Sequence, residues 1–211
     1  MKFEYIDRNN WKREEYFRHY KENIPCTYSI SAKLDISNIK NRNEKIYPAM
    51  LYAISTIVNR HEEFRTSLDE DGRVGVFDEM MPCYTVFNKE TEMFSNIWTE
   101  YRKDYSEFKR LYIEDVENYG NFTSMNAKPG TPINTFPVSM IPWISFEGFN
   151  LNLQKGYDYL LPIFTMGKYC IEDGKYIMPI SVQVHHAVCD GFHVSRFINE
   201  LQEFINKFEW I

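Results

Sequence analysis

Residues 26–36, CTYSISAKLDI, are the most regular stretch of the chain and restrict its fold more than any other. Apolar and polar side chains alternate strictly along this stretch: Cys26, Tyr28, Ile30, Ala32, Leu34 and Ile36 against Thr27, Ser29, Ser31, Lys33 and Asp35. A period of two is that of a β-strand with one apolar and one polar face. The chain is therefore expected to build a sheet that packs one side against a core.

Four further segments predict helices, by apolar spacing or by capping residues. They are a short helix in 9–20 capped by Asn9 or Asn10, a buried helix over 47–61, a polar-aromatic helix from about 97 to 118, and a final amphipathic helix over 194–208. Other strands are expected at 64–78, as two short strands joined at Asp71-Gly72, at 83–88, at 136–146, and as a hairpin over 161–186 that turns at Asp173-Gly174.

The irregular order of these elements predicts a single α/β domain, residues 1–211, with a mixed β-sheet and flanking helices. Neither GxGxxG nor GxxxxGK[ST] occurs, so a nucleotide-phosphate loop finds no support. The net charge of −6 and the lack of a long Lys or Arg run argue against a nucleic-acid partner. Aromatic residues make up 17% of the chain, which suits a core, an interface or a pocket for a ring-bearing ligand.

No apolar run approaches the roughly 18 residues of a membrane span, and the first residues, MKFEYIDRNNWKREEYF, do not resemble a signal peptide. The four cysteines, Cys26, Cys83, Cys170 and Cys189, are widely separated and form no CxxC pair. They are expected to be reduced and buried, in a cytoplasmic protein.

The stretch SVQVHHAVCDGFHVSRF, residues 181–197, concentrates the chemistry. If the strand period continues, His186 follows Val184 onto the apolar side. A neutral imidazole with its other nitrogen hydrogen-bonded can accept a proton there, and a reference pKa near 6.5 suits a general base. Asp190-Gly191 then opens the helix, whose N-terminus favours the negative charge of Asp190. A buried carboxylate at this place would prefer an arginine partner.

Three interpretations fit this spacing. The histidines can be structural side chains at a strand end, or His186, Asp190 and His193 can be metal ligands, or one histidine can be a catalytic base. The metal interpretation lacks a supporting CxxC or HExxH pattern. Spacing alone does not separate the three.

The string HHAVCDGFH resembles the HHxxxDG signature of the CoA-dependent acyltransferase superfamily, and of the chloramphenicol acetyltransferase family in particular. The resemblance spans the chain in the family's order: NWKREEYFRHY, IPCTYSI, YPAMLYAI, TVFNKETEMFS, SMIPWISFEGFNLN, PIFTMGKY and VQVHHAVCDGFHVSRFINELQE. It implies O-acetylation of the primary hydroxyl of chloramphenicol by acetyl-CoA, without a metal, which confers resistance to the antibiotic.

The resemblance also implies residue roles. His186 is the general base of a direct transfer with no acyl-enzyme, and Ser139 of SMIPW stabilises the oxyanion. Asp190 pairs with Arg13 and holds the histidine loop. The implied substrate pocket comprises Tyr20, Ile24, Cys26, Thr85, Phe94, Phe149, Leu151, Ile163 and Thr165, and the implied coenzyme-A channel comprises Trp143, Tyr159 and Lys168.

Two positions depart from the family pattern: Pro137 stands where many relatives have asparagine, and His19 where an aromatic residue is common. Larger members of the superfamily carry two halves with the tunnel between them, whereas this chain has one HHxxxDG set. The resemblance therefore implies a homotrimer in which His186 of one subunit faces its neighbour's pocket. The alternatives are a dihydrolipoyl acyltransferase-like catalytic domain and a non-catalytic metal-binding protein that uses His186, Asp190 and His193; loss of stability with a chelator would indicate the latter.

Overall fold

A mixed β-sheet organises the computed structural model, which describes residues 1–153 and 158–209. The strand order in the seven-stranded sheet is β2 (Thr27–Asp35), β10 (Lys175–His185), β8 (Ile163–Gly167), β7 (Thr135–Ile141), β5 (Met81–Asn88) and β6 (Met93–Trp98), with β9 (Cys170–Glu172) paired to the start of β10. Strand β7 runs parallel to both of its neighbours and the other pairs are antiparallel. The predicted mixed sheet is confirmed.

A second, smaller sheet contains β1 (Phe3–Tyr5), β4 (Val74–Phe77) and β3 (Thr66–Leu68). Strands β3 and β4 are the two short strands predicted around Asp71-Gly72. Gly72 has a φ of +77°, a backbone conformation that glycine adopts without steric cost. The turn predicted at Asp173-Gly174, between β9 and β10, has the same feature, since Gly174 also has a φ of +77°.

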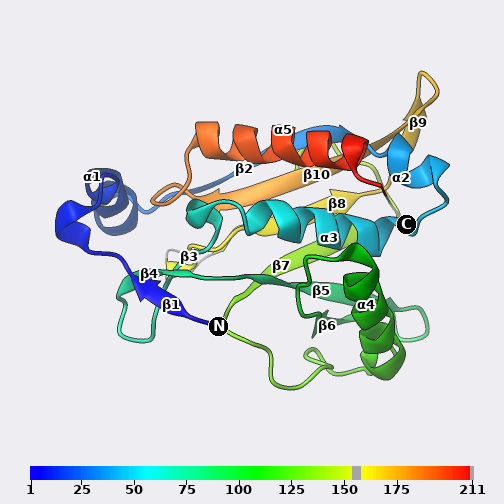
Figure 1. Cartoon of the computed structure of the whole chain (residues 1–211), viewed down its shortest axis with the longest axis horizontal. Helices are drawn as coiled ribbons and strands as arrows, with labels where there is room; N and C mark the ends of the chain where they lie inside the picture. Colours follow the sequence, from blue (N-terminus) through cyan, green and yellow to red (C-terminus); the bar gives the residue numbers. More distant parts are fainter. Residues whose placement is uncertain (154–157, 210–211) are drawn as a thin grey trace.

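Helices α3 (Ile46–Val58) and α5 (Gly191–Lys207) run side by side over one face of the large sheet (Figure 1). The register places Val182, Phe164 and Val138 in one row on that face. Phe197 of α5 packs on this row, with its ring 5.1 Å from that of Phe164. The core is therefore the layer between the sheet and these two helices.

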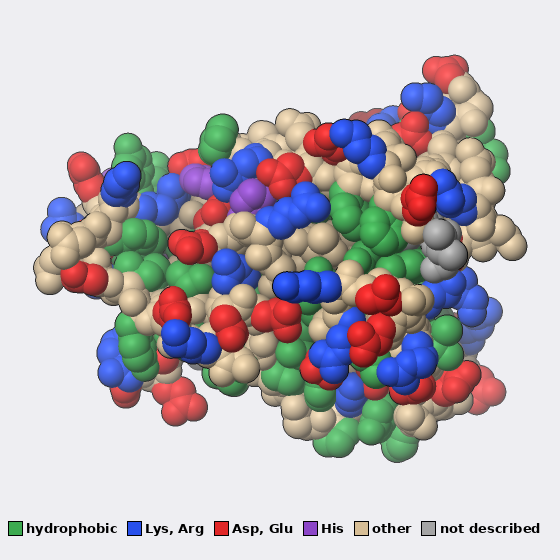
Figure 2. Space-filling view, in the orientation of Figure 1, with side chains coloured by type: hydrophobic (Ala, Val, Ile, Leu, Met, Phe, Trp, Pro, Cys, Tyr) green, Lys and Arg blue, Asp and Glu red, His purple; other side chains and the backbone are tan. Residues whose placement is uncertain are grey.

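The remaining helices are short or peripheral. They are α2 (Ser37–Asn41), α4 (Tyr105–Tyr119), η1 (Arg8–Asn10), η3 (Glu62–Phe64), and α1 (Glu14–Arg18), which continues into a π-helical turn, η2 (His19–Asn23). Among the described residues, no helix combines the length and apolar character needed to cross a bilayer. On the side seen in Figure 2, acidic and basic side chains are interspersed over the surface.

Several expectations were wrong in detail. The helix expected from about residue 97 begins at Tyr105, where Asp104 accepts a hydrogen bond from the Glu107 N–H at 2.8 Å. Ile97 lies instead in β6, a strand that was not predicted. At the N-terminus, Asp7 rather than Asn9 or Asn10 is the cap, and it caps η1.

The cysteines are all free thiols, but the expectation that they are buried holds only for Cys189. The other three, Cys26, Cys83 and Cys170, are half-buried. Cys26 precedes the edge strand β2 and Cys170 begins the short strand β9, whereas Cys83 lies within β5 and alternates with the buried Pro82 and Tyr84.

Candidate active site

The backbone around the histidine pair is fixed by hydrogen bonds at the end of β10. The His186 N–H donates to the Cys26 carbonyl at 2.9 Å, which ties the strand end to the residue before β2. The N–H groups of Val188 and Cys189 both donate to the His185 carbonyl, at 3.1 and 3.0 Å. His185 itself is fully buried, and its Nδ1 accepts from the Ala187 N–H at 3.1 Å. The two histidines thus have different environments, and only His186 reaches the surface.

The imidazole of His186 lies between two tyrosines. It stacks on Tyr20, with 3.9 Å between ring centroids and 5° between planes, and Tyr28 approaches at 5.2 Å and 60°. Tyr20 is presented by the π-helical turn η2, a local widening of the helix that is frequent at functional sites. His186 Nδ1 is buried and has no hydrogen-bond partner within the described residues. The partly exposed ring is therefore held by contact with aromatic faces.

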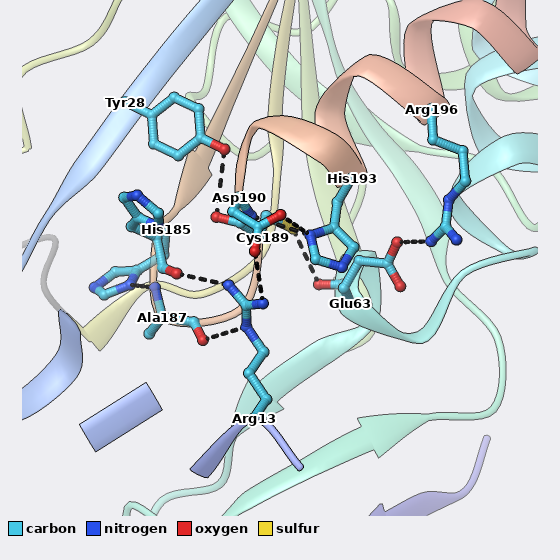
Figure 3. A network of polar contacts seen from close by, with 10 residues as sticks. Arg13, Tyr28, Glu63, His185, Ala187, Cys189, Asp190, His193 and Arg196 are labelled. Atoms are coloured by element: carbon cyan, nitrogen blue, oxygen red, sulfur yellow. Dashed lines mark hydrogen bonds and ion pairs between the residues drawn. The ribbon is translucent and has the colours of Figure 1, made fainter. Parts of the chain in front are cut away.

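Arg13 contacts the histidine loop through three separate nitrogens (Figure 3). Its Nε donates to the Ala187 carbonyl at 2.8 Å, its Nη2 to the His186 carbonyl at 3.0 Å, and its Nη1 to Asp190 Oδ2 at 3.0 Å. A planar guanidinium holds its donors in a rigid fork, so these contacts fix the loop in orientation as well as position. The structure thus brings the predicted partners Arg13 and Asp190 together.

The Asp190 carboxylate has a second side-chain neighbour, His193, which the sequence indicated only as a metal ligand. His193 Nδ1 lies 2.6 Å from Asp190 Oδ1. Burial alone would raise the pKa of Asp190, but the hydrogen bond from Arg13 and the charge of His193 outweigh it and lower the pKa. No group of three or more His, Cys, Asp or Glu side chains suited to a metal ion occurs in residues 1–153 and 158–209.

Ser139 lies on the sheet face opposite to the helices. The register places Ser31, Ser181, Thr165 and Ser139 side by side on four neighbouring strands. Paired residues point to the same side of a sheet, so hydroxyl groups form a row across this face. Ser139 is half-buried in that row.

Segment 146–151 crosses the same face above β2 and β10. Ser181 Oγ donates to the Phe149 carbonyl at 2.5 Å, and the Phe149 N–H donates to Ser31 Oγ at 3.3 Å. The Gln183 amide bonds both the N–H and the carbonyl of Leu151, at 2.6 and 2.9 Å. Sequence reasoning missed these anchors, because the only signal was the polar face of each strand.

A groove of about 780 Å³ opens between this segment and the edge strand β2. Phe149 and Leu151, two of the predicted pocket residues, line it together with Tyr28, Ser29 and Gln183. Polar side chains dominate the lining of the groove, and the rings of Tyr28 and Phe149 and the side chain of Leu151 lie among them. A groove with both kinds of side chain suits a small molecule that carries polar and apolar groups.

His186 and Ser139 are far apart within one chain. Ser139 is opposite Thr165, Thr165 is opposite Ser181, and His186 follows Ser181 by five positions, one residue past the end of β10. A strand rises about 3.3 Å per residue and neighbouring strands are about 4.8 Å apart, so the two side chains are separated by roughly 20 Å. A single reacting atom cannot contact both side chains of the same chain.

The predicted pocket residues fall into the same two groups. Near His186 are Tyr20, which stacks on the ring, Cys26, whose carbonyl holds the backbone, and Ile24, which is 59% exposed. The second group lies on the same sheet face as Ser139. It consists of the strand residues Thr85, Phe94, Ile163 and Thr165 and of Phe149 and Leu151 in segment 146–151.

Two of the predicted coenzyme-A residues lie in adjoining segments. Trp143 is 60% exposed and meets the Phe87 ring edge-on at 4.7 Å. The next residue, Ile144, accepts a hydrogen bond from the Lys168 N–H at 2.9 Å. Tyr159 is more enclosed, and burial raises the pKa of its hydroxyl.

The two departures from the family pattern have different surroundings. Pro137 lies on β7 opposite Cys83, two residues before Ser139. His19 lies edge-on against Tyr20, with ring centroids 4.7 Å apart. Because Tyr20 stacks on His186, the Tyr20 ring lies between His19 and the candidate catalytic residue.

The architecture is that of the acetyltransferase cores. A solved dihydrolipoamide acetyltransferase from Azotobacter vinelandii matches with a TM-score of 0.68 and 16% identity over 92% of this chain and 86% of that chain. A solved chloramphenicol acetyltransferase matches with a TM-score of 0.85 and 23% identity over 97% of this chain and 100% of that chain. These likenesses establish the fold.

Sequence comparison narrows the class. A sequence model of the chloramphenicol acetyltransferase family matches residues 1–202. The chloramphenicol acetyltransferase of Campylobacter coli is 66% identical over 98% of this chain and 100% of its own length, and that of Vibrio anguillarum is 64% identical over 99% and 97%. The chain belongs to the chloramphenicol acetyltransferase family, and the predicted resemblance is confirmed.

Proposed function

We propose that the protein transfers the acetyl group of acetyl-CoA directly to the primary hydroxyl of chloramphenicol, at a site shared by two copies of the chain. Family membership supports the reaction. The environment of His186 supports its assignment as the base. Its imidazole stacks on Tyr20, the ring is partly exposed, and Nδ1 is buried. This leaves Nε2 as the nitrogen that can meet a substrate.

In the proposed step, His186 Nε2 removes the hydroxyl proton while the hydroxyl oxygen attacks the thioester carbonyl carbon. The resulting oxyanion accepts a hydrogen bond from the Ser139 hydroxyl. Collapse of the tetrahedral intermediate breaks the carbon–sulfur bond, and the leaving thiolate takes the proton back from the imidazolium. Positioning, one base and one oxyanion donor suffice because a thioester is already activated.

The separation of roughly 20 Å between His186 and Ser139 supports a site between subunits, because neighbouring strands and residue spacing fix that separation within the sheet. A closed ring of copies can place His186 of each subunit opposite Ser139 of the next. We propose the homotrimer that the family resemblance implies. Tyr20, Ile24 and Cys26 would then belong to the His186 side of each site, and Thr85, Phe94, Phe149, Leu151, Ile163 and Thr165 to the Ser139 side.

Trp143, Tyr159 and Lys168 are proposed to flank the coenzyme-A channel. The Trp143 ring is exposed, and the Lys168 backbone bonds to Ile144, the residue after Trp143. An exposed aromatic ring and a lysine on adjoining segments suit a phosphate-bearing cofactor with an adenine ring. A cytoplasmic location is proposed as well, since acetyl-CoA is a metabolite of that compartment and the four thiols are free.

The test mixes the purified protein with acetyl-CoA and chloramphenicol, follows release of free thiol, and identifies the acetylated drug by mass. Chloramphenicol with a blocked primary hydroxyl is the matched control and should give no thiol. Dihydrolipoamide serves as a second acceptor: faster turnover with it than with chloramphenicol would overturn the proposal in favour of the dihydrolipoyl acyltransferase alternative. Activity that persists in EDTA would exclude the metal-binding alternative.

A further inference from the structure

We propose that His193 is a positioning residue: it orients Asp190, and through Arg13 it fixes the loop that carries His186. The inference rests on the proposed function, because it concerns the placement of the proposed base. It adds a third member to the contact between Arg13 and Asp190, and it gives the last histidine of HHAVCDGFH a role that is neither metal binding nor proton transfer to substrate.

The Nδ1 atom of His193 has two neighbours on the same residue. It lies 2.6 Å from Asp190 Oδ1 and 3.1 Å from the Asp190 backbone nitrogen. If Nδ1 were unprotonated it would accept from the backbone N–H, but its lone pair would then face a carboxylate oxygen. The shorter contact is the one to the charged atom, at the distance of a charge-assisted hydrogen bond. We therefore assign the 2.6 Å contact as a hydrogen bond from His193 Nδ1–H to Asp190 Oδ1, in preference to the longer donation of the Asp190 backbone N–H to Nδ1.

This donation leaves each carboxylate oxygen of Asp190 with its own partner. Oδ1 accepts from His193, and Oδ2 accepts from Arg13 Nη1 at 3.0 Å. The other donors of Arg13 hold the carbonyls of His186 and Ala187. The contacts form one continuous path from the first turn of α5 to the backbone of His186. Figure 3 shows the labelled residues His193, Asp190, Arg13 and Ala187 along it.

The surroundings of His193 keep its ring in place. Phe192 meets it edge-on, with ring centroids 5.6 Å apart, and Arg196 lies 5.4 Å from the Phe192 ring centroid. Arg196 pairs with Glu63, whose carbonyl accepts from the Cys189 thiol at 3.6 Å. The charged groups around the ring are thus Asp190, Arg13, Glu63 and Arg196, of which Asp190 is the one in contact with Nδ1. The ring is 20% exposed, so it is held in place without being sealed from solvent.

The decisive comparison is between His193→Asn and His193→Leu. Asparagine places an amide N–H near the position of Nδ1, whereas leucine has almost the same shape and no donor. We expect His193→Leu to lower kcat about tenfold with both KM values within twofold, and His193→Asn to restore most of kcat. His61→Ala is the control, since His61 Nε2 makes a similar contact, 2.9 Å from Glu200, away from the histidine loop. A folded His193→Leu enzyme with wild-type kcat would overturn the proposal.

A second readout needs no activity. Hydrogen exchange at the amides of Val188 and Cys189 reports on the loop, because both donate to the His185 carbonyl. Exchange is expected to rise at least about tenfold in His193→Leu and to stay at the wild-type rate in His193→Asn and His61→Ala. If the hydrogen-exchange rate in His193→Leu equals that of the wild type, the positioning role is overturned, whether or not any variant is active. If the wild-type protein itself shows no turnover, the proposed function is overturned instead. His193→Ala replaces the leucine variant if that variant does not fold.

Discussion

The guanidinium of Arg13 and the carboxylate of Asp190 meet at 3.0 Å, although 177 positions separate them in the chain. Arg13 precedes α1 and Asp190 precedes α5, so the pair joins the N-terminal segment to the loop between β10 and α5. The same guanidinium holds two loop carbonyls. This contact is therefore expected to affect both the stability of the fold and the position of the proposed catalytic base, and both effects can be measured.

Replacement of Asp190 by asparagine is expected to destabilise the fold by roughly 1–2 kcal/mol at neutral pH. The Arg13 side chain is 16% exposed and would lose its counter-charge, while the 36% exposure of Asp190 moderates the loss. Urea unfolding followed by circular dichroism checks this value. Arg110→Gln is the control, because its ion pair with Glu114 is exposed on α4.

The pH dependence of this difference has a definite sign. The folded-state pKa of Asp190 is lowered, so its carboxylate contributes stability above its unfolded pKa of about 4, and that contribution is lost as pH falls through the lowered value. The stability gap between wild type and Asp190→Asn should therefore narrow as the pH falls below about 4. A gap that widens in acid would contradict the assigned shift.

Replacement of His186 by alanine is expected to reduce kcat by roughly 10²–10⁴-fold while the protein remains folded. Its ring contacts Tyr20 and Tyr28 at the margin of the domain, so the loss of packing is small beside the loss of the base. Thiol release measures turnover and circular dichroism measures folding. Drug acetylation at the wild-type rate by the folded variant would remove His186 from the mechanism.

Replacement of Ser139 by alanine removes the proposed oxyanion donor and should slow kcat by about 10²-fold with little change in the KM for chloramphenicol. Ser55→Ala is the control, since Ser55 is a buried serine that donates to the Leu51 carbonyl within α3, away from the hydroxyl row. A larger effect on KM than on kcat would indicate that Ser139 binds substrate instead.

Mixed oligomers test the shared site directly. His186→Ala and Ser139→Ala chains are each impaired, but an interface that takes His186 from one and Ser139 from the other is intact. Random co-assembly of equal amounts should restore roughly a quarter of wild-type activity, because one interface in four pairs the two intact residues. If co-assembly restores nothing although hybrids form, as shown by native mass spectrometry, the site lies within one chain.

Regular strands and tight turns were predictable because their signals are local. The alternation of residues 26–36 matches β2 to within one residue at each end, and the turns at Gly72 and Gly174 need the left-handed backbone that glycine tolerates. Strand β6 was not predicted because MFSNIW shows only a weak alternation of apolar and polar residues. The segment that follows it also has an aromatic spacing that favours a helix. The sequence signal that places the start of α4 correctly is Asp104, a residue type that often caps a helix N-terminus.

The candidate site was less accessible to such reasoning. His186 and Asp190 stand out as residue types, but the partner of Asp190 lies at the other end of the chain and was named only through the family resemblance. The anchors Ser181 and Gln183 were part of a predicted strand, yet nothing local shows that a distant loop crosses above them. Contacts between remote segments depend on the register of the sheet, which periodicity does not specify.

The place of β10 between β2 and β8 has a consequence for how the protein is made. Ribosomes deliver β2 early and β10 after every other strand of the large sheet, so β2 has no neighbour to bond until translation is well advanced. In the nascent chain, β2 therefore stays unpaired for most of synthesis. Pairing between strands that are far apart in the sequence is also slow to form. The strand order therefore leaves the backbone of β2 open to non-native pairing until β10 has been synthesised.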